Sequence, residues 1–169
     1  MLLYEGEKEN YFLYMAQPQQ APTDQDYPPR EFVFVVDVSG SMNGFPLQVS
    51  KKLLRKLIGQ LRPTDQFNVV LFAGANQTWQ TSSLAATENN LSSALTFLDQ
   101  ARGGGGTQLL RALQTAYALP RAAEGLSRNF VVVTDGYISV EPEVFDLVRK
   151  NLNQANVYSF GIGSGVNRH

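Results

Sequence analysis

The sequence lacks cysteine altogether, and its single histidine is the last residue, His169. These absences exclude disulfides, thiolate metal sites and a cysteine nucleophile, and they leave no internal histidine for a Ser-His-Asp triad. Charged residues make up only 17% of the 169 residues, and the formal net charge is −1. This balance argues against a nucleic-acid partner, because nucleic-acid-binding domains usually carry a strongly basic face.

Long hydrophobic runs are absent too. Apolar runs such as residues 32–36 and 130–133 are far too short to cross a bilayer, so we expect no direct membrane insertion by this segment. Residues 1–8 lack the basic region and the apolar stretch of a signal peptide. We therefore expect either an intracellular protein or a piece of a longer precursor. The 43% apolar content is high for a disordered chain and predicts one folded domain.

Segments of strand and helix character alternate from residue 31 onward. Strands are predicted at residues 32–36, 67–72, 77–81, 130–133 and 157–162, and helices from Pro46 to Pro63, over 87–101, from Thr107 and over 141–151. This alternation predicts a Rossmann-like three-layer α/β/α sandwich, with a mostly parallel sheet and residues 77–81 as an antiparallel edge strand. We expect residues 1–30 to be an extension or linker that adds an edge strand, and residues 31–169 to be a domain truncated at its C-terminal helix.

Polar side chains follow two of the predicted strands. Asp37, Ser39 and Ser41 come directly after the first buried strand, Asp135 follows the fourth, and Thr107 follows a run of four glycines. If the strand order is 3-2-1-4-5, these loops meet at the switch point of the sheet, where open α/β folds bind ligands. Two carboxylates and three hydroxyls form an all-oxygen site, which suits Mg²⁺ first, with Mn²⁺ or Ca²⁺ as alternatives. Such a site keeps a coordination position open for a carboxylate from outside the domain.

Other interpretations of these motifs are weaker. Asp and Ser at a strand-to-helix turn often cap the helix, but capping does not explain Thr107 and Asp135. A serine hydrolase would need the G-x-S-x-G spacing and a histidine, and both are missing here. The glycine run at residues 103–106 has no lysine before Thr107, so the phosphate-binding P-loop pattern fails.

The pattern Asp37-x-Ser39-x-Ser41, with Thr107 and Asp135, resembles the metal-ion-dependent adhesion site of von Willebrand factor type A domains. Residues 7–12, 63–68 and 160–168 are most similar to the A domains of inter-α-trypsin inhibitor heavy chains and related bacterial proteins. The resemblance implies that Ser39, Ser41 and Thr107 bind the ion directly, and that Asp37 and Asp135 bind it directly or through water.

The resemblance also implies an extracellular, periplasmic or cell-surface location, and a monomeric domain within a larger protein. The family's last helix is not part of this sequence. The predicted function is a divalent-cation-dependent adhesion or protein-binding module, in which an Asp or Glu of a protein ligand completes the metal coordination. The alternative is a structural or assembly domain whose metal only stabilises loops, and an enzyme is not expected.

Overall fold

The computed structural model describes residues 2–6, 9–15, 27–135 and 142–162. Its strands are β1 (Leu2–Glu5), β2 (Asn10–Leu13), β3 (Arg30–Asp37), β4 (Gln66–Phe72), β5 (Asn76–Thr78), β6 (Leu84–Ala85), β7 (Ser127–Thr134) and β8 (Asn156–Gly161). Its helices are the 3-10 helix η2 (Gly40–Met42) and the α-helices α1 (Phe45–Ile58), α2 (Glu88–Gln100), α3 (Leu109–Ala118) and α4 (Pro142–Lys150).

The main sheet has the strand order β5-β4-β3-β7-β8, with β6 paired to β4. Strands β4, β3, β7 and β8 are parallel, whereas β5 and β6 run antiparallel to β4. In the numbering of the five predicted strands this is the order 3-2-1-4-5, the condition under which the loops after the first and fourth strands meet. The central strands are continuous apolar runs because helices cover both of their faces.

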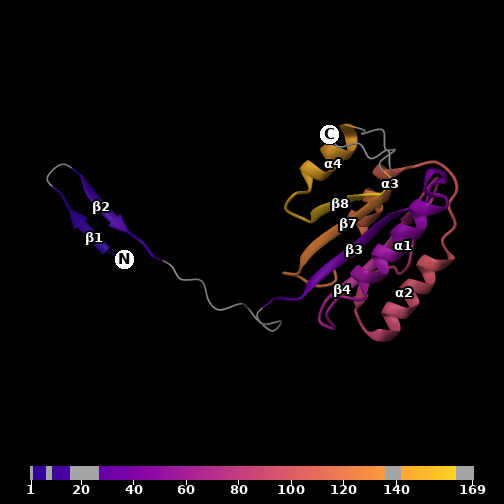
Figure 1. The fold of residues 1–169 in the computed structure, drawn as a ribbon, viewed down its shortest axis with the longest axis horizontal. Coiled ribbons are helices and arrows are strands. Elements are labelled where there is room, and N and C mark those ends of the chain that lie inside the picture. The colour runs from indigo at the N-terminus through magenta and orange to yellow at the C-terminus, as the bar shows by residue number, and fades with distance from the viewer. Residues whose placement is uncertain (1, 7–8, 16–26, 136–141, 163–169) are drawn as a thin grey trace.

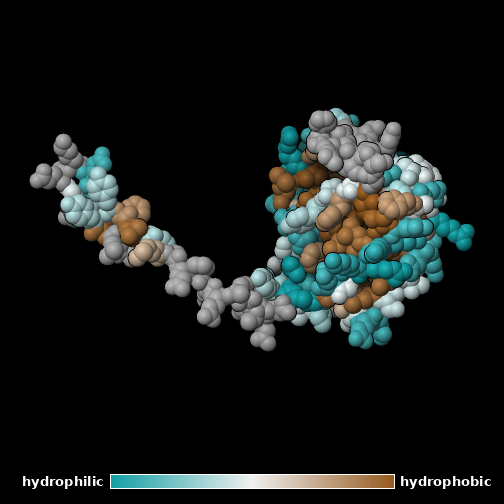
Figure 2. All heavy atoms as spheres, in the orientation of Figure 1, coloured by the Kyte–Doolittle hydropathy of each residue, from teal (hydrophilic) through white to brown (hydrophobic). Residues whose placement is uncertain are grey.

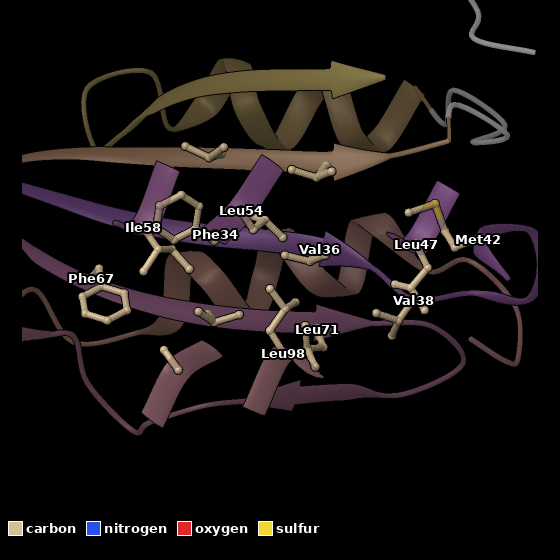
Figure 3. Close-up of a cluster of buried hydrophobic side chains, with 14 of the residues drawn as sticks. Phe34, Val36, Val38, Met42, Leu47, Leu54, Ile58, Phe67, Leu71 and Leu98 are labelled. Carbon is tan, nitrogen blue, oxygen red and sulfur yellow. The ribbon is translucent and has the colours of Figure 1, made fainter. Parts of the chain in front are cut away.

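Helices form a layer on each side of this sheet (Figure 1). On one side α1 and α2 pack on the face of the sheet that includes Phe34, Val36 and Leu71, and Figure 3 shows Leu54 and Ile58 of α1 beside Phe34. On the other side α3 and α4 pack on the opposite face, which includes Val35 and Phe130. The fold is therefore the predicted three-layer α/β/α sandwich.

The helix boundaries depend on local capping. The Thr87 hydroxyl accepts a hydrogen bond from the Asn90 N–H at the start of α2. Thr107, in contrast, does not open α3. The backbone of Gln108 has φ −120° and ψ 66°, outside the helical region, so the helix begins at Leu109.

The N-terminal strands form a separate antiparallel pair, in which Tyr4 lies opposite Tyr11. In the described residues this segment pairs with itself, and the expectation that residues 1–30 add an edge strand stays a prediction. Tyr4 and Phe12 are exposed. A two-stranded hairpin with exposed aromatic side chains is at best marginally stable alone in water.

Apolar surface is also exposed beside α1. A groove of about 330 Å³ lies between α1 and β8 and includes Phe34, Leu57 and Phe160 in its lining. Figure 2 shows apolar surface over the strands at this place. Tyr158 and Phe160 are 53% and 40% exposed, so the described helices leave this part of the sheet uncovered. Among the described residues, none of the helices is both long and apolar enough to cross a membrane.

Candidate metal centre

The candidate site lies where β3 and β7 end. The two parallel strands pair with Val36 opposite Val133, so Asp37 and Thr134 stand at the same level of the sheet. Asp135 is the next residue after β7 and is half-buried. The strand pairing thus brings together the two predicted acidic residues, Asp37 and Asp135, at one edge of the sheet.

Asp37 is completely buried at this edge, with none of its surface exposed. Its Oδ1 accepts a hydrogen bond of 2.8 Å from the backbone N–H of Ser39, and its Oδ2 accepts one of 2.8 Å from the hydroxyl of Thr134. Both oxygens are therefore held in fixed directions, and each retains a further lone pair that can accept another bond.

Ser39 and Ser41 point their hydroxyls at each other, with 3.1 Å between the two oxygens. Ser39 is buried, whereas Ser41 is exposed to solvent. Ser39 stands at the N-cap position of η2 without a side-chain hydrogen bond to that helix, and the N-cap of α1 is Gly44. Helix capping therefore does not explain these two hydroxyls, and they are available as a pair of neutral oxygen ligands.

The glycine loop before Thr107 packs on the loop that follows β3. The N–H of Gly104 donates to the carbonyl of Val38 at 3.0 Å, and the N–H of Gly40 donates to the carbonyl of Gly105 at 3.0 Å. Gly105 has φ +78°, and a Cβ there would lie 3.1 Å from the backbone nitrogen of Gly74. A residue with a side chain would be strained at this position, so glycine allows the close packing of this loop, which ends directly before Thr107.

Among the described residues two other acidic side chains are buried, and arginines neutralise both. Glu31 pairs with Arg128 at 2.8 Å, with side-chain exposures of 1% and 4%. Asp65 accepts a hydrogen bond of 2.8 Å from Arg62 and lies 3.5 Å from Arg30. Burial alone would raise the pKa of Asp65, but hydrogen bonds from Arg62 and Arg30 and the charge of Arg30 outweigh it and lower this pKa.

Asp37 differs from both of them. Within the described part of the chain, no Lys or Arg side chain forms an ion pair with it. A buried carboxylate is costly unless a cation or several hydrogen-bond donors compensate its charge. Its two neutral donors compensate it only partly, so a divalent cation fits the electrostatics of this position.

The donor set of the site consists of oxygen alone. Residues 2–6, 9–15, 27–135 and 142–162 contain no group of three or more His, Cys, Asp or Glu side chains that could hold a metal. A site here would rely on the hydroxyls of Ser39, Ser41 and Thr107 beside two carboxylates, a combination that favours hard cations such as Mg²⁺. Thr134 was not among the residues predicted from the sequence. Its position directly before Asp135, at the end of a strand, could have indicated that its hydroxyl lies near the site.

Within the described residues, the groups that a serine hydrolase or a nucleotide site would need do not come together at this edge. The Ser39 hydroxyl faces another hydroxyl, and the only histidine, His169, lies outside the described residues. The Gly104 N–H is bonded to Val38, so it does not point at a phosphate from the glycine loop. The arrangement suits ion binding better than nucleophilic or nucleotide chemistry.

Two basic residues of α1, Lys51 and Arg55, connect this helix to the end of α2. The Lys51 ammonium donates to the carbonyls of Asp99 and Ala101 at 2.9 Å each, and Arg55 forms an ion pair with Asp99. A cation at the carbonyl end of a helix is favourable because it offsets the helix dipole. These contacts fix the end of α2 from which the glycine loop departs.

Known proteins share both the sequence pattern and the fold. Residues 30–169 match the model of the von Willebrand factor type A domain. The chain is 31% identical over 172 residues to inter-alpha-trypsin inhibitor heavy chain 4 of Mus musculus, an alignment that covers 95% of this chain and 18% of that protein. The chain thus spans less than a fifth of the length of this relative.

Two solved structures show the same architecture. A von Willebrand factor type A structure from Catenulispora acidiphila superposes with a TM-score of 0.75 at 20% identity, covering 83% of this chain and 34% of that one. The manganese-loaded TRAP protein of Plasmodium vivax superposes with a TM-score of 0.66 at 20% identity, covering 82% and 59% of the two chains. Family model, relatives and fold agree, and the chain belongs to the von Willebrand factor type A domain family.

Proposed function

We propose that this domain is a divalent-cation-dependent protein-binding or adhesion module. The observation that carries the proposal is a contrast among the buried acids of the described residues: Glu31 and Asp65 form ion pairs with arginine, and Asp37 has no such pair there. A cation bound beside Asp37 would compensate its charge, as Arg128 and Arg62 do for the other two.

The proposed ligands are Ser39, Ser41 and Thr107, with Asp37 and Asp135 bound directly or through water. Mg²⁺ is the ion we expect first, and Mn²⁺ and Ca²⁺ are alternatives; the TRAP protein with this fold was solved loaded with manganese. Because three of these five ligands are neutral hydroxyls, the ion would remain a strong Lewis acid. We propose that an Asp or Glu of a protein ligand supplies the remaining coordination.

The role is one of binding and not of catalysis. Within the described residues, the hydrogen bond given for the Ser39 hydroxyl joins it to the Ser41 hydroxyl and not to a general base of the kind that a hydrolase requires. We propose further that the domain works as a monomeric unit of a larger extracellular, periplasmic or cell-surface protein. The support is its similarity to a region of an inter-alpha-trypsin inhibitor heavy chain.

Isothermal titration of the chelator-treated chain with Mg²⁺, Mn²⁺ and Ca²⁺ tests the site. We expect binding heat in the wild type, and loss of it in Asp37→Ala and in Ser41→Ala. Because Ser41 is exposed, Ser41→Ala should not unfold the domain, so a loss of ion binding in this variant would reflect the loss of a ligand. The matched control is Asp146→Ala, which removes an exposed carboxylate on α4 and should bind the ion normally.

The alternative function, a structural domain whose ion only stabilises loops, predicts a different outcome in a binding assay. A partner of such a domain would bind equally well in chelator, whereas a partner of the proposed module would be released by it. Equal ion binding in the wild type and in both site variants would contradict the metal site itself.

A further inference from the structure

A second recess opens at the same edge of the sheet as the candidate metal centre. It is a cavity of about 480 Å³ between the end of α2, the turn after β4 and the glycine loop. Its apolar lining comes from Val38, Leu71, Ala73, Phe97 and Ala101. Cavities of this size and character commonly bind ligand groups.

The recess is continuous with the loops that carry the proposed metal ligands. Gly105 lines it, and the Gly105 carbonyl accepts the hydrogen bond from Gly40, which lies between Ser39 and Ser41. Gly104 also lines it and is bonded to Val38, one residue before Ser39. A partner residue that reached the ion would therefore place its neighbours in the chain over this recess.

The charge at its rim is positive. Arg102 is the one charged side chain among the described lining residues, and it is exposed. The acidic residue nearest to it in sequence, Asp99, is already bound by Arg55. The rim therefore attracts an acidic partner, whereas the interior of the recess accepts an apolar group.

Resting on the proposed function, we propose that this recess is the specificity pocket of the metal-dependent site. It receives an apolar side chain that lies close in sequence to the carboxylate with which the partner binds the ion. Arg102 favours partners whose binding segment is acidic overall. The module would thus recognise a short segment that combines Asp or Glu with an apolar residue at a fixed spacing.

Ala75 offers a way to fill the pocket without touching the metal ligands. It lies in the turn between β4 and β5, is exposed, and lines the recess, and the hydrogen bond that it accepts from Ala73 uses its backbone carbonyl. Ala75→Trp should therefore occupy the recess and leave ion binding unchanged. The matched control is Ala123→Trp, an exposed position between α3 and β7, at the other end of the strands.

The experiment selects a displayed random peptide library on the wild-type chain in Mg²⁺ or Mn²⁺ and releases bound peptides with EDTA. We expect the released peptides to contain Asp or Glu together with an apolar residue at one spacing. A synthetic peptide of this kind should bind Ala75→Trp about ten- to a hundredfold more weakly than it binds the wild type and Ala123→Trp. Replacing its apolar residue by Ala should weaken binding to the wild type by a similar factor and hardly affect binding to Ala75→Trp.

Two outcomes would overturn the pocket, and they are distinguishable. If the released peptides share an acidic residue but no apolar residue, the result would contradict the specificity pocket. It would still agree with the metal-dependent function. Peptides that remain bound in EDTA, or a selection that enriches none, would contradict the metal-dependent function and the pocket with it. Equal affinity of the synthetic peptide for Ala75→Trp and the wild type would also exclude the pocket.

Discussion

The hydroxyl of Thr134, at the end of β7, donates a hydrogen bond of 2.8 Å to Oδ2 of Asp37, at the end of β3. The two residues are 97 positions apart in the sequence, and the pairing of their strands brings them into contact. Thr134 therefore fixes the orientation of the buried carboxylate on which the proposed metal site depends.

Replacing Thr134 by valine tests this relationship, because valine keeps the shape of threonine and removes the donor. We expect Thr134→Val to weaken Mg²⁺ binding about 10- to 100-fold, the usual cost of losing a hydrogen bond that orients a metal ligand. Isothermal titration measures it. Thr134→Ser retains the hydroxyl and should bind the ion nearly as well as the wild type; equal loss in both variants would argue against the hydroxyl as the cause.

Most of the fold was predictable from the sequence because buried parallel strands are continuous runs of β-branched and aromatic residues. The strand order 3-2-1-4-5 entered the sequence argument only as a condition, and the observed pairing of β3 with β4 and β7 fulfils it. Strand β6, with only two residues, gave too short a pattern to be predicted. The start of α3 was predicted wrongly because the backbone of Gln108 lies outside the helical region, so the helix begins two residues after Thr107.

The site was predictable in part. The spacing of Asp37, Ser39 and Ser41 identifies one loop, and local sequence alone suffices for that. The contact between Gly105 and Gly40, and the hydrogen bond from Thr134, depend on long-range packing. The pairing of Glu31 with Arg128 also depends on long-range packing. Only the comparison with this pair shows that Asp37 is a buried acid without an ion pair among the described residues.

The ion pair between Glu31 and Arg128 lies at the opposite end of β3 and β7 from the candidate metal centre. Arg128 also donates to the carbonyls of Leu119 and Pro120, and Glu31 accepts a hydrogen bond of 2.7 Å from Ser83. Removing one partner leaves the other charge buried without compensation. We expect Arg128→Met to lower the free energy of unfolding by about 3–5 kcal/mol, measured by urea denaturation.

The double variant Glu31→Leu/Arg128→Met serves as the control for that ion pair. It removes both charges, so it should be clearly more stable than Arg128→Met alone. A double variant as unstable as the single one would assign the loss to the carbonyl contacts of Arg128 and not to the unpaired charge on Glu31.

Stability at acid pH should depend on Asp65. Its pKa in the folded state lies below the ordinary value of 3.8, because hydrogen bonds from Arg62 and Arg30 outweigh the effect of burial. A carboxyl whose pKa is lowered by folding stabilises the fold above its unfolded pKa, and this contribution is lost as the pH falls through the folded pKa. We therefore expect the free energy of unfolding to decline as the pH falls from about 5 through the region below 3.8.

Urea denaturation across this range, with Asp65→Asn as the comparison, measures the contribution of Asp65. The variant should be less stable than the wild type at neutral pH, since a neutral amide replaces a carboxylate held by two arginines. Its stability should fall less steeply in acid. Parallel curves for the two proteins would show that other carboxyl groups account for the decline.

Tyr117 of α3 carries a buried hydroxyl with no hydrogen-bond partner in the described part of the chain. Its ring packs edge-on against Phe130, with 4.7 Å between the ring centroids. Tyr117→Phe keeps this ring contact and removes the unsatisfied polar atom, so we expect it to raise the free energy of unfolding by about 1 kcal/mol. Urea denaturation at neutral pH measures this gain, and Tyr158→Phe, which alters an exposed hydroxyl, should leave stability unchanged.

The same variant should differ from the wild type in alkali. Burial raises the pKa of Tyr117 above the ordinary value of 10.0, so the folded state resists ionisation of this group. An acid whose pKa is raised by folding stabilises the fold below its unfolded pKa, and this contribution is lost as the pH rises above that value. The gain from Tyr117→Phe should therefore grow as the pH rises through 10.0. A gain that stayed constant over this range would mean that the Tyr117 hydroxyl reaches solvent in the folded protein.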